Sequence, residues 1–220
     1  MGIQRLAMKQ IGGLLLSTVI MAYLPSQGRG EAREIASPDG RRVAYVGRRA
    51  ADGWFTLFLK LGSHTRDLLP GDAGGKLGSP GRRSIALGVW LNNGELSFQY
   101  HCGTGCVGIY KIDVDTRRIV ELWTGEVDSG VHWSPRGDRA LVGTHLGGLL
   151  MISSDGTHTE VPGCRIVNYN AMGSLYLFEE WMADGTSVRV RKLGCKDLEK
   201  RPSGGERLVW DGHSFSPPIQ

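Results

Sequence analysis

Short apolar runs, separated by turns rich in glycine and aspartate, recur along most of the chain. One set of runs directly follows a turn, at residues 42–47, 95–100, 139–144 and 174–179. A second set follows after a short loop, at residues 54–61, 107–114, 149–153 and 187–193. Runs of this length, rich in Val, Ile, Tyr and Phe and bounded by turn residues, predict β-strands. Further short strands are expected at residues 119–123 and 207–210, and no amphipathic helix is predicted after the N-terminal segment.

The turns themselves repeat. An aromatic or small residue precedes a four-residue bend in Ala36–Gly40, Trp90–Gly94, Trp133–Gly137 and Tyr169–Gly173, and Phe215-Ser216-Pro217 begins the same pattern again. The glycines of the first four turns are 54, 43 and 36 residues apart. A period of about 40–50 residues is typical of the blades of a β-propeller. The sequence therefore predicts an all-β chain of about four four-stranded antiparallel blades. A β-sandwich is the competing architecture.

Each residue type in these turns has a physical role. Proline presets φ at the first corner, aspartate bonds the local backbone and glycine accepts a left-handed conformation. This reasoning assigns structural turn roles to Pro38, Asp39, Gly40, Gly94, Pro135, Gly137 and Gly173. The preceding rings of Trp90, Trp133 and Tyr169 are expected to pack between blades, where burying one ring contributes about 1.5–3 kcal/mol. A platform on which carbohydrate stacks is the alternative role for these rings.

These residues resemble a known family. The segment Ser37–Tyr45 (SPDGRRVAY) is very similar to the repeat of TolB-like, WD-repeat-like β-propeller proteins, and Trp133–Gly137 (WSPRG) is a second close copy. The resemblance covers roughly residues 33–217 and implies a propeller fold, with proteins as partners. We expect this chain to lack the separate N-terminal domain of TolB. The last strand either closes a ring by pairing near Ile35 or leaves an incomplete, irregular ring, as in a truncated relative of larger propellers.

The first 28 residues form a segment of a different kind. Arg5 and Lys9 precede an apolar run at residues 11–22, and small residues follow, with a cleavage point after Gly28. This order predicts a secretory signal peptide at residues 1–28. An uncleaved signal anchor is the alternative. The remaining residues 29–220 are predicted to be one β-propeller-like domain, exported to the periplasm or secreted, with no membrane span after cleavage.

Charge argues against a nucleic-acid partner. The formal net charge is +4, and removal of Arg5 and Lys9 leaves +2. The remaining basic residues are scattered as pairs, whereas nucleic-acid binding needs a concentrated basic surface.

The chain has four cysteines, and all four follow the predicted signal peptide. Cys102 and Cys106 bracket a Gly-Thr-Gly hairpin tip, so their thiols are expected to form a disulfide. Cys164 and Cys195 are the remaining pair, but the predicted meander puts them at opposite ends of strands, about 15–20 Å apart. The pairing of Cys164 with Cys195 therefore stays open. Cys102, Cys106 and a single neighbouring histidine lack the second ligand pair of a zinc motif, so no metal or cofactor is predicted.

Four residues define a candidate binding face. His101 and His145 end corresponding strands, and Trp54 and Trp181 flank loops that the predicted register makes equivalent. Loops on one face of a rigid scaffold commonly serve recognition, although ordinary loop residues would look the same. No G-x-S-x-G elbow, P-loop or dinucleotide fingerprint is present. We therefore expect a non-enzymatic protein that binds or scaffolds proteins in the bacterial envelope. A propeller hydrolase or lyase acting on peptide or glycan is the alternative.

Overall fold

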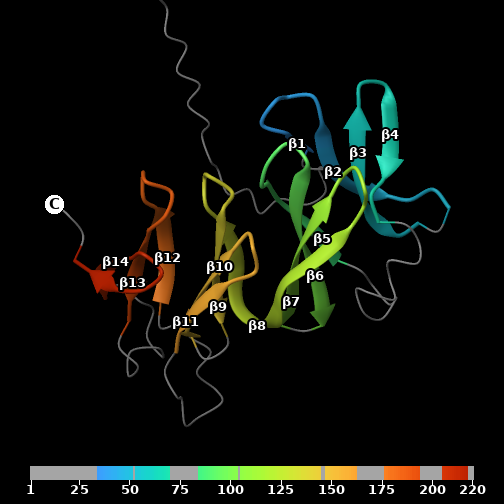
Figure 1. Cartoon of the computed structure of the whole chain (residues 1–220). Coiled ribbons are helices and arrows are strands. Elements are labelled where there is room, and N and C mark those ends of the chain that lie inside the picture. The colour runs from blue at the N-terminus through green and yellow to red at the C-terminus, as the bar shows by residue number, and fades with distance from the viewer. Residues whose placement is uncertain are drawn as a thin grey trace, which may run out of the picture. The chain divides into compact units, whose positions relative to one another are not determined.

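The computed structural model describes residues 34–51, 53–69, 84–103, 105–144, 147–162, 176–193 and 205–217. Within these ranges there are fifteen β-strands and no α-helix (Figure 1). Neighbouring strands in sequence pair in antiparallel fashion in each sheet. The predicted all-β chain of antiparallel units is confirmed.

Blade 1 is a sheet of four consecutive strands. These are β1 (Glu34–Ala36), β2 (Val43–Arg48), β3 (Phe55–Leu61) and β4 (His64–Asp67), paired in that order. We refer to the four strands of any blade as A, B, C and D in chain order, and to the turns by the strands that they join.

Blades 2 and 3 share one long strand and therefore form a single seven-stranded sheet. Its strands are β5 (Ser84–Trp90), β6 (Glu95–Gly103), β7 (Cys106–Asp113), β8 (Ile119–Trp133), β9 (Arg139–Thr144), β10 (Leu149–Ser153) and β11 (His158–Val161). The first half of β8 pairs with β7 as strand D of blade 2. The second half pairs with β9 as strand A of blade 3, after a register shift between Val127 and Val131.

Blade 4 is again a sheet of four strands. These are β12 (Tyr176–Trp181), β13 (Val188–Lys192), β14 (Glu206–Trp210) and β15 (Phe215–Ser216), paired in that order.

Backbone hydrogen bonds define the repeating A–B turn. In the segments 37–42 and 134–139, the first residue's N–H donates to the carbonyl of the sixth, and the fourth residue's N–H donates to the carbonyl of the first, at 2.8–2.9 Å. The segment 182–187 makes the same two bonds at 2.9 Å. The fourth residue of each is a glycine with φ between 66° and 74°, namely Gly40, Gly137 and Gly185.

This equivalence corrects the sequence register of the last blade. The fourth turn is Trp181–Gly185, which spaces the turn glycines 54, 43 and 48 residues apart. The predicted turn at Tyr169–Gly173 lies outside the described residues. Phe215 does not begin a fifth unit: β15 pairs with β14 as strand D, and the Phe215 ring stacks on Tyr176 at 5.3 Å. The Met182–Asp184 turn lacks the Ser-Pro pair of turns 1 and 3, and Tyr169–Gly173 has the same aromatic-to-glycine spacing nearer to the preceding copy.

The turn side chains stabilise these bends by hydrogen bonds. Asp184 accepts bonds from the Ser187 hydroxyl (2.7 Å) and from the N–H groups of Thr186 and Ser187 (2.8 and 3.1 Å), which lower its pKa to about 2. The second A–B turn differs, because the Asn92 side chain accepts from the N–H groups of Gly94 and Glu95. As a result Gly94 does not adopt a positive φ, contrary to the expectation for this position.

The hydrophobic core consists of layers between consecutive blades. Ala44, Leu57 and Leu59 of blade 1 pack with Leu96 and Phe98 of blade 2. A second cluster joins blades 2 and 3 through Val107, Ile109, Leu122, Val142, Leu150 and Ile152. A third joins blades 3 and 4 through Leu141, Leu149, Met151, Val188, Val190, Leu208 and Trp210. Because each face of a strand takes alternate residues, the inner blades use both faces for packing.

In blades 2 and 3 the tryptophan before the A–B turn contacts the preceding blade. Trp90 is 8% exposed, and its indole N–H donates to the carbonyl of Ile35 in blade 1 at 3.1 Å. In the same way, the indole of Trp133 lies over blade 2 at Gly88: a Cβ built on Gly88 would stand 2.9 Å from Trp133 Nε1. That Cβ would also be 2.2 Å from Ser97 Oγ. Gly88 is therefore the place where blade 3 approaches blade 2.

Replacing Gly88 by alanine tests this contact. The new methyl group meets the fully buried Ser97 and the Trp133 ring, so we expect Gly88→Ala to lower the free energy of unfolding by about 1–3 kcal/mol. Gly94→Ala is the matched control, because its nearest neighbour is 3.5 Å away. Urea unfolding of both variants makes the comparison. Equal stability of the two would contradict the close approach.

A histidine lies between blades 3 and 4. The His132 ring stacks on Phe178 at 4.1 Å, and burial lowers the pKa of its imidazole. A lowered histidine pKa means that the unfolded chain binds the proton more readily. The contribution of neutral His132 to the free energy of unfolding is therefore complete above the unfolded pKa near 6.5 and is lost as pH falls below it.

The variant His132→Phe keeps the ring stack and removes the titration. Between about pH 7 and pH 5, we expect the urea midpoint of the unmodified protein to fall more steeply than that of His132→Phe. The two titration curves should differ in slope below the unfolded pKa and run parallel above it. Parallel curves throughout would show that His132 titrates alike in both states.

The first and last blades are not joined by any described strand pairing. Ile35 pairs with Ala44 of β2, and β15 pairs with β14. Of the two endings that the sequence left open, ring closure by pairing of the last strand near Ile35 is thus absent from the described strands.

Candidate functional site

The A–B turns of the four blades follow one another at one end of the sheets. The Asp39 N–H donates to Asn93 Oδ1 at 3.0 Å, which joins turns 1 and 2. A Cβ on Gly137 would lie 2.8 Å from the carbonyl of Trp90, and one on Gly185 would lie 2.7 Å from the Arg136 side chain. The B–C turns therefore lie at the other end, because strand B runs from one turn to the next. We call these the A–B end and the B–C end.

The structure separates the residues of the predicted binding face. Trp54 lies at the B–C end in the turn after β2, and His101 lies at the same end within the last residues of β6. Trp181 ends β12 immediately before an A–B turn, so it lies at the opposite end and occupies the position of Trp90 and Trp133. This is a correction that follows from the changed register of blade 4. His145 lies outside the described residues.

An aromatic and basic patch stands at the B–C end of blade 1. Trp54 is 40% exposed and Phe55 is 42% exposed. Arg48 pairs with Phe55 across the β2–β3 hairpin, and its guanidinium carbon lies 4.7 Å from the centre of the Phe55 ring. Such a cation–π contact holds the charge over the ring. We call Arg48, Trp54 and Phe55 the Trp54 patch.

A polar network below the Trp54 patch fixes the hairpin. Arg49 Nε lies 2.6 Å from Asp67 Oδ2, and the Thr56 hydroxyl donates to Asp67 Oδ1 at 2.7 Å. Asp67 also accepts from the Leu69 N–H at 2.9 Å, and the Arg49 guanidinium donates to the Leu69 carbonyl. The Arg49 N–H in turn bonds the carbonyl of Trp54 at 2.8 Å. The loop is thereby held to strand D of its own blade.

Sequence reasoning identified Trp54 but missed Arg48 and Phe55. Phe55 is two residues before Leu57 and four before Leu59, which are fully buried. Strand alternation puts all three on one face, so the sequence predicts that Phe55 is a core residue. It is exposed because it begins the strand, next to the turn. Gly53 is a turn signal in the sequence, and a hairpin that turns there places Arg48 opposite Phe55.

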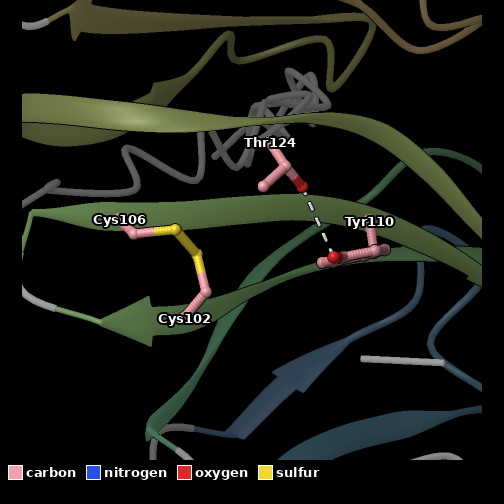
Figure 2. Close-up of a disulfide and its surroundings, with 4 residues drawn as sticks. All are labelled: Cys102, Cys106, Tyr110 and Thr124. Carbon is pink, nitrogen blue, oxygen red and sulfur yellow. Dashed lines mark hydrogen bonds between the residues drawn. A yellow bond between two sulfur atoms is a disulfide. The ribbon is translucent and has the colours of Figure 1, made fainter. Parts of the chain in front are cut away.

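The second feature of the B–C end is the disulfide at the β6–β7 tip. Cys102 and Cys106 are bonded, with their Cα atoms 5.1 Å apart (Figure 2). His101 is exposed beside them. Below the tip, the Tyr110 ring covers Gly108, and its hydroxyl lies 3.4 Å from that of Thr124 on β8. Cys164 and Cys195 lie outside the described residues.

Two further findings concern the described part of the chain. No three His, Cys, Asp or Glu residues gather there as ligands for a metal ion. Those same ranges also hold no helix with the length and hydropathy needed to span a bilayer.

Comparison with known proteins gives the fold. No protein-family model matches the sequence, and no curated protein matches it significantly. The β-propeller domain of the Trilobed protease from Pyrococcus furiosus is similar over 84% of this chain and 56% of that domain, with 12% identity and a TM-score of 0.52. A structure from an analysis of two prolyl endopeptidases is similar over 86% of this chain and 28% of that one, with 13% identity and a TM-score of 0.53.

TolB from Acinetobacter baumannii is also similar, with 15% identity and a TM-score of 0.46 over 84% of this chain and 42% of TolB. The chain thus spans little more than half, or less, of each of these structures. At such identities the likeness to the two propeller-containing proteins above establishes the fold alone. This chain is a β-propeller-type structure.

Proposed function

We propose that this chain is an exported, non-enzymatic β-propeller protein of the TolB-like type that binds another protein through the B–C end of its blades. The observation that carries the proposal is the Trp54 patch, in which two large rings stand exposed beside a guanidinium group. Aromatic residues, above all Trp, and Arg are enriched among the residues that dominate the binding energy of protein interfaces.

The support under the patch favours binding. The network of Arg49, Thr56 and Asp67 holds the turn to β4, so its backbone loses little freedom when a partner docks. Pre-organisation of this kind increases affinity, because less ordering entropy is lost on binding. The repeat Ser37–Tyr45 supports the TolB-like assignment, and the disulfide suits an oxidising compartment.

A double substitution at the Trp54 patch tests the binding site. Three proteins are immobilised: the unmodified chain, the variant Trp54→Ser/Phe55→Ser and the control Leu61→Ser. Each is exposed to an envelope extract, and the proteins that it retains are identified. Leu61 is a matched control because it is 36% exposed but lies at the other end of β3. We expect one partner to be retained by the unmodified protein and the control only.

The purified partner is then titrated against all three proteins. Loss of two interface hot-spot side chains should weaken its Kd by about 30-fold or more, while Leu61→Ser leaves Kd unchanged. An unchanged Kd in the double variant would refute the site. Turnover of a peptide or glycan substrate by the purified chain would instead refute the non-enzymatic part and favour a hydrolase or lyase.

Export makes a separate prediction about the N-terminus. If residues 1–28 are a signal peptide, the protein recovered from the envelope or medium begins at Arg29, because cleavage follows Gly28. Mass spectrometry of the intact protein measures this directly. A recovered chain that still carries the apolar run 11–22 would indicate an uncleaved anchor.

A further inference from the structure

The two cysteines of the Cys102–Cys106 bond are not equally exposed. Cys102 is exposed at the end of β6, and Cys106 is half-buried at the start of β7. Figure 2 shows the bond bridging these two strands at the tip of the hairpin. A thiol arriving from solvent therefore meets Cys102 first, and accessibility is one of the factors that set the rate of thiol–disulfide exchange.

The backbone holds the two cysteines differently. The β6–β7 ladder shifts register between His101 and Gly103, which leaves Cys102 in a bulge without a ladder partner. Cys106 pairs with Gly103 on one side and with Glu126 of β8 on the other. The carbonyl of the adjacent Gly105 accepts from the Val127 N–H at 2.7 Å. Opening the bond therefore frees the bulge and leaves the ladder intact.

The bond is expected to stabilise the blade less than a disulfide that closes a long loop. It links residues only four apart, and the entropy that a crosslink removes from the unfolded chain is small for so short a loop. The neighbouring ladder and the buried residues Phe98, Val107 and Ile109 hold the hairpin without it. A bond that closes so short a loop and lies at an exposed residue is suited to exchange.

We propose that Cys102–Cys106 is a thiol–disulfide exchange site that accepts electrons from a dithiol. One thiolate of the dithiol attacks Cys102 Sγ, the S–S bond breaks, and Cys106 leaves as a thiolate that takes up a proton. The second thiol of the dithiol, as its thiolate, then attacks the dithiol sulfur that is bonded to Cys102. Cys102 is released as a thiolate, which takes up a proton. The products are two cysteine thiols here and one disulfide in the oxidised dithiol. This activity does not depend on the Trp54 patch.

An equilibrium experiment tests whether the native fold resists reduction. The full chain is equilibrated with mixtures of reduced and oxidised dithiothreitol, once native and once in denaturant, and free thiols are then alkylated. The chain is then digested, and mass spectrometry of the peptide that contains Cys102 and Cys106 measures their alkylation separately from that of Cys164 and Cys195. A structural disulfide is harder to reduce in the folded chain, because its stabilisation of the fold must be lost.

We expect the native pair to be half reduced at no more reductant than the unfolded pair needs, with an unchanged far-ultraviolet circular dichroism spectrum. A native midpoint that needs about tenfold more reductant, or reduction that accompanies loss of the β-sheet spectrum, would overturn the proposal and leave a structural disulfide.

A pair of single variants tests the direction of attack. Cys106→Ser leaves the exposed thiol, and Cys102→Ser leaves the half-buried one, in otherwise matched chains. With glutathione disulfide as the probe, we expect Cys106→Ser to form its adduct about tenfold faster or more, because access differs. Equal rates, or a faster reaction of Cys102→Ser, would overturn the assignment of Cys102 as the attacked sulfur. If either variant fails to fold, the dithiothreitol experiment on the unmodified chain still decides whether the bond is an exchange site.

Discussion

Packing of each blade on the next is the constraint on which the rest of the structure depends. A four-stranded sheet of this size has two faces and little interior, so its apolar side chains are buried only when another sheet covers them. The three core clusters lie between successive blades. The tryptophan before the A–B turn adds a directional contact, and in Trp90 the indole N–H bonds the preceding blade. Close approach at Gly88 is a consequence of the same packing.

The last blade carries different side chains on the face that does not pack against blade 3. In β13, Val188 and Val190 point toward blade 3, whereas Arg189 and Arg191 lie on the other face. There Arg191 and Arg207 both bond Glu179, and Arg189 pairs with Glu180. Charged side chains thus occupy this face of blade 4, where the corresponding faces of blades 1 to 3 carry apolar ones. These ion pairs hold the charged groups on a face that no described sheet covers.

Both candidate sites lie at the B–C end, away from the contacts between A–B turns. The A–B turns bond one another and are constrained by their neighbours. In blades 1 and 2 the described parts of the B–C hairpins project from strands that are already paired. The Trp54 patch and the Cys102–Cys106 tip belong to different blades and use different chemistry. They share one physical basis, which is a loop whose foundation is rigid and whose tip is exposed.

The sequence by itself determined the strands, the glycine-dependent turns and the local disulfide, because these depend on residues close together in the chain. It determined the positions of the first three A–B turns, although Gly94, unlike Gly40 and Gly137, does not adopt a positive φ. The fourth was missed, because Tyr169–Gly173 has the same aromatic-to-glycine spacing as Trp181–Gly185, and it is the backbone hydrogen bonds that identify the turn. Only the tertiary structure decided that Trp181 and Trp54 lie at opposite ends and that Phe55 is exposed while Leu57 is buried. Those outcomes depend on which strand faces which blade, and that is set by packing between segments far apart in the sequence.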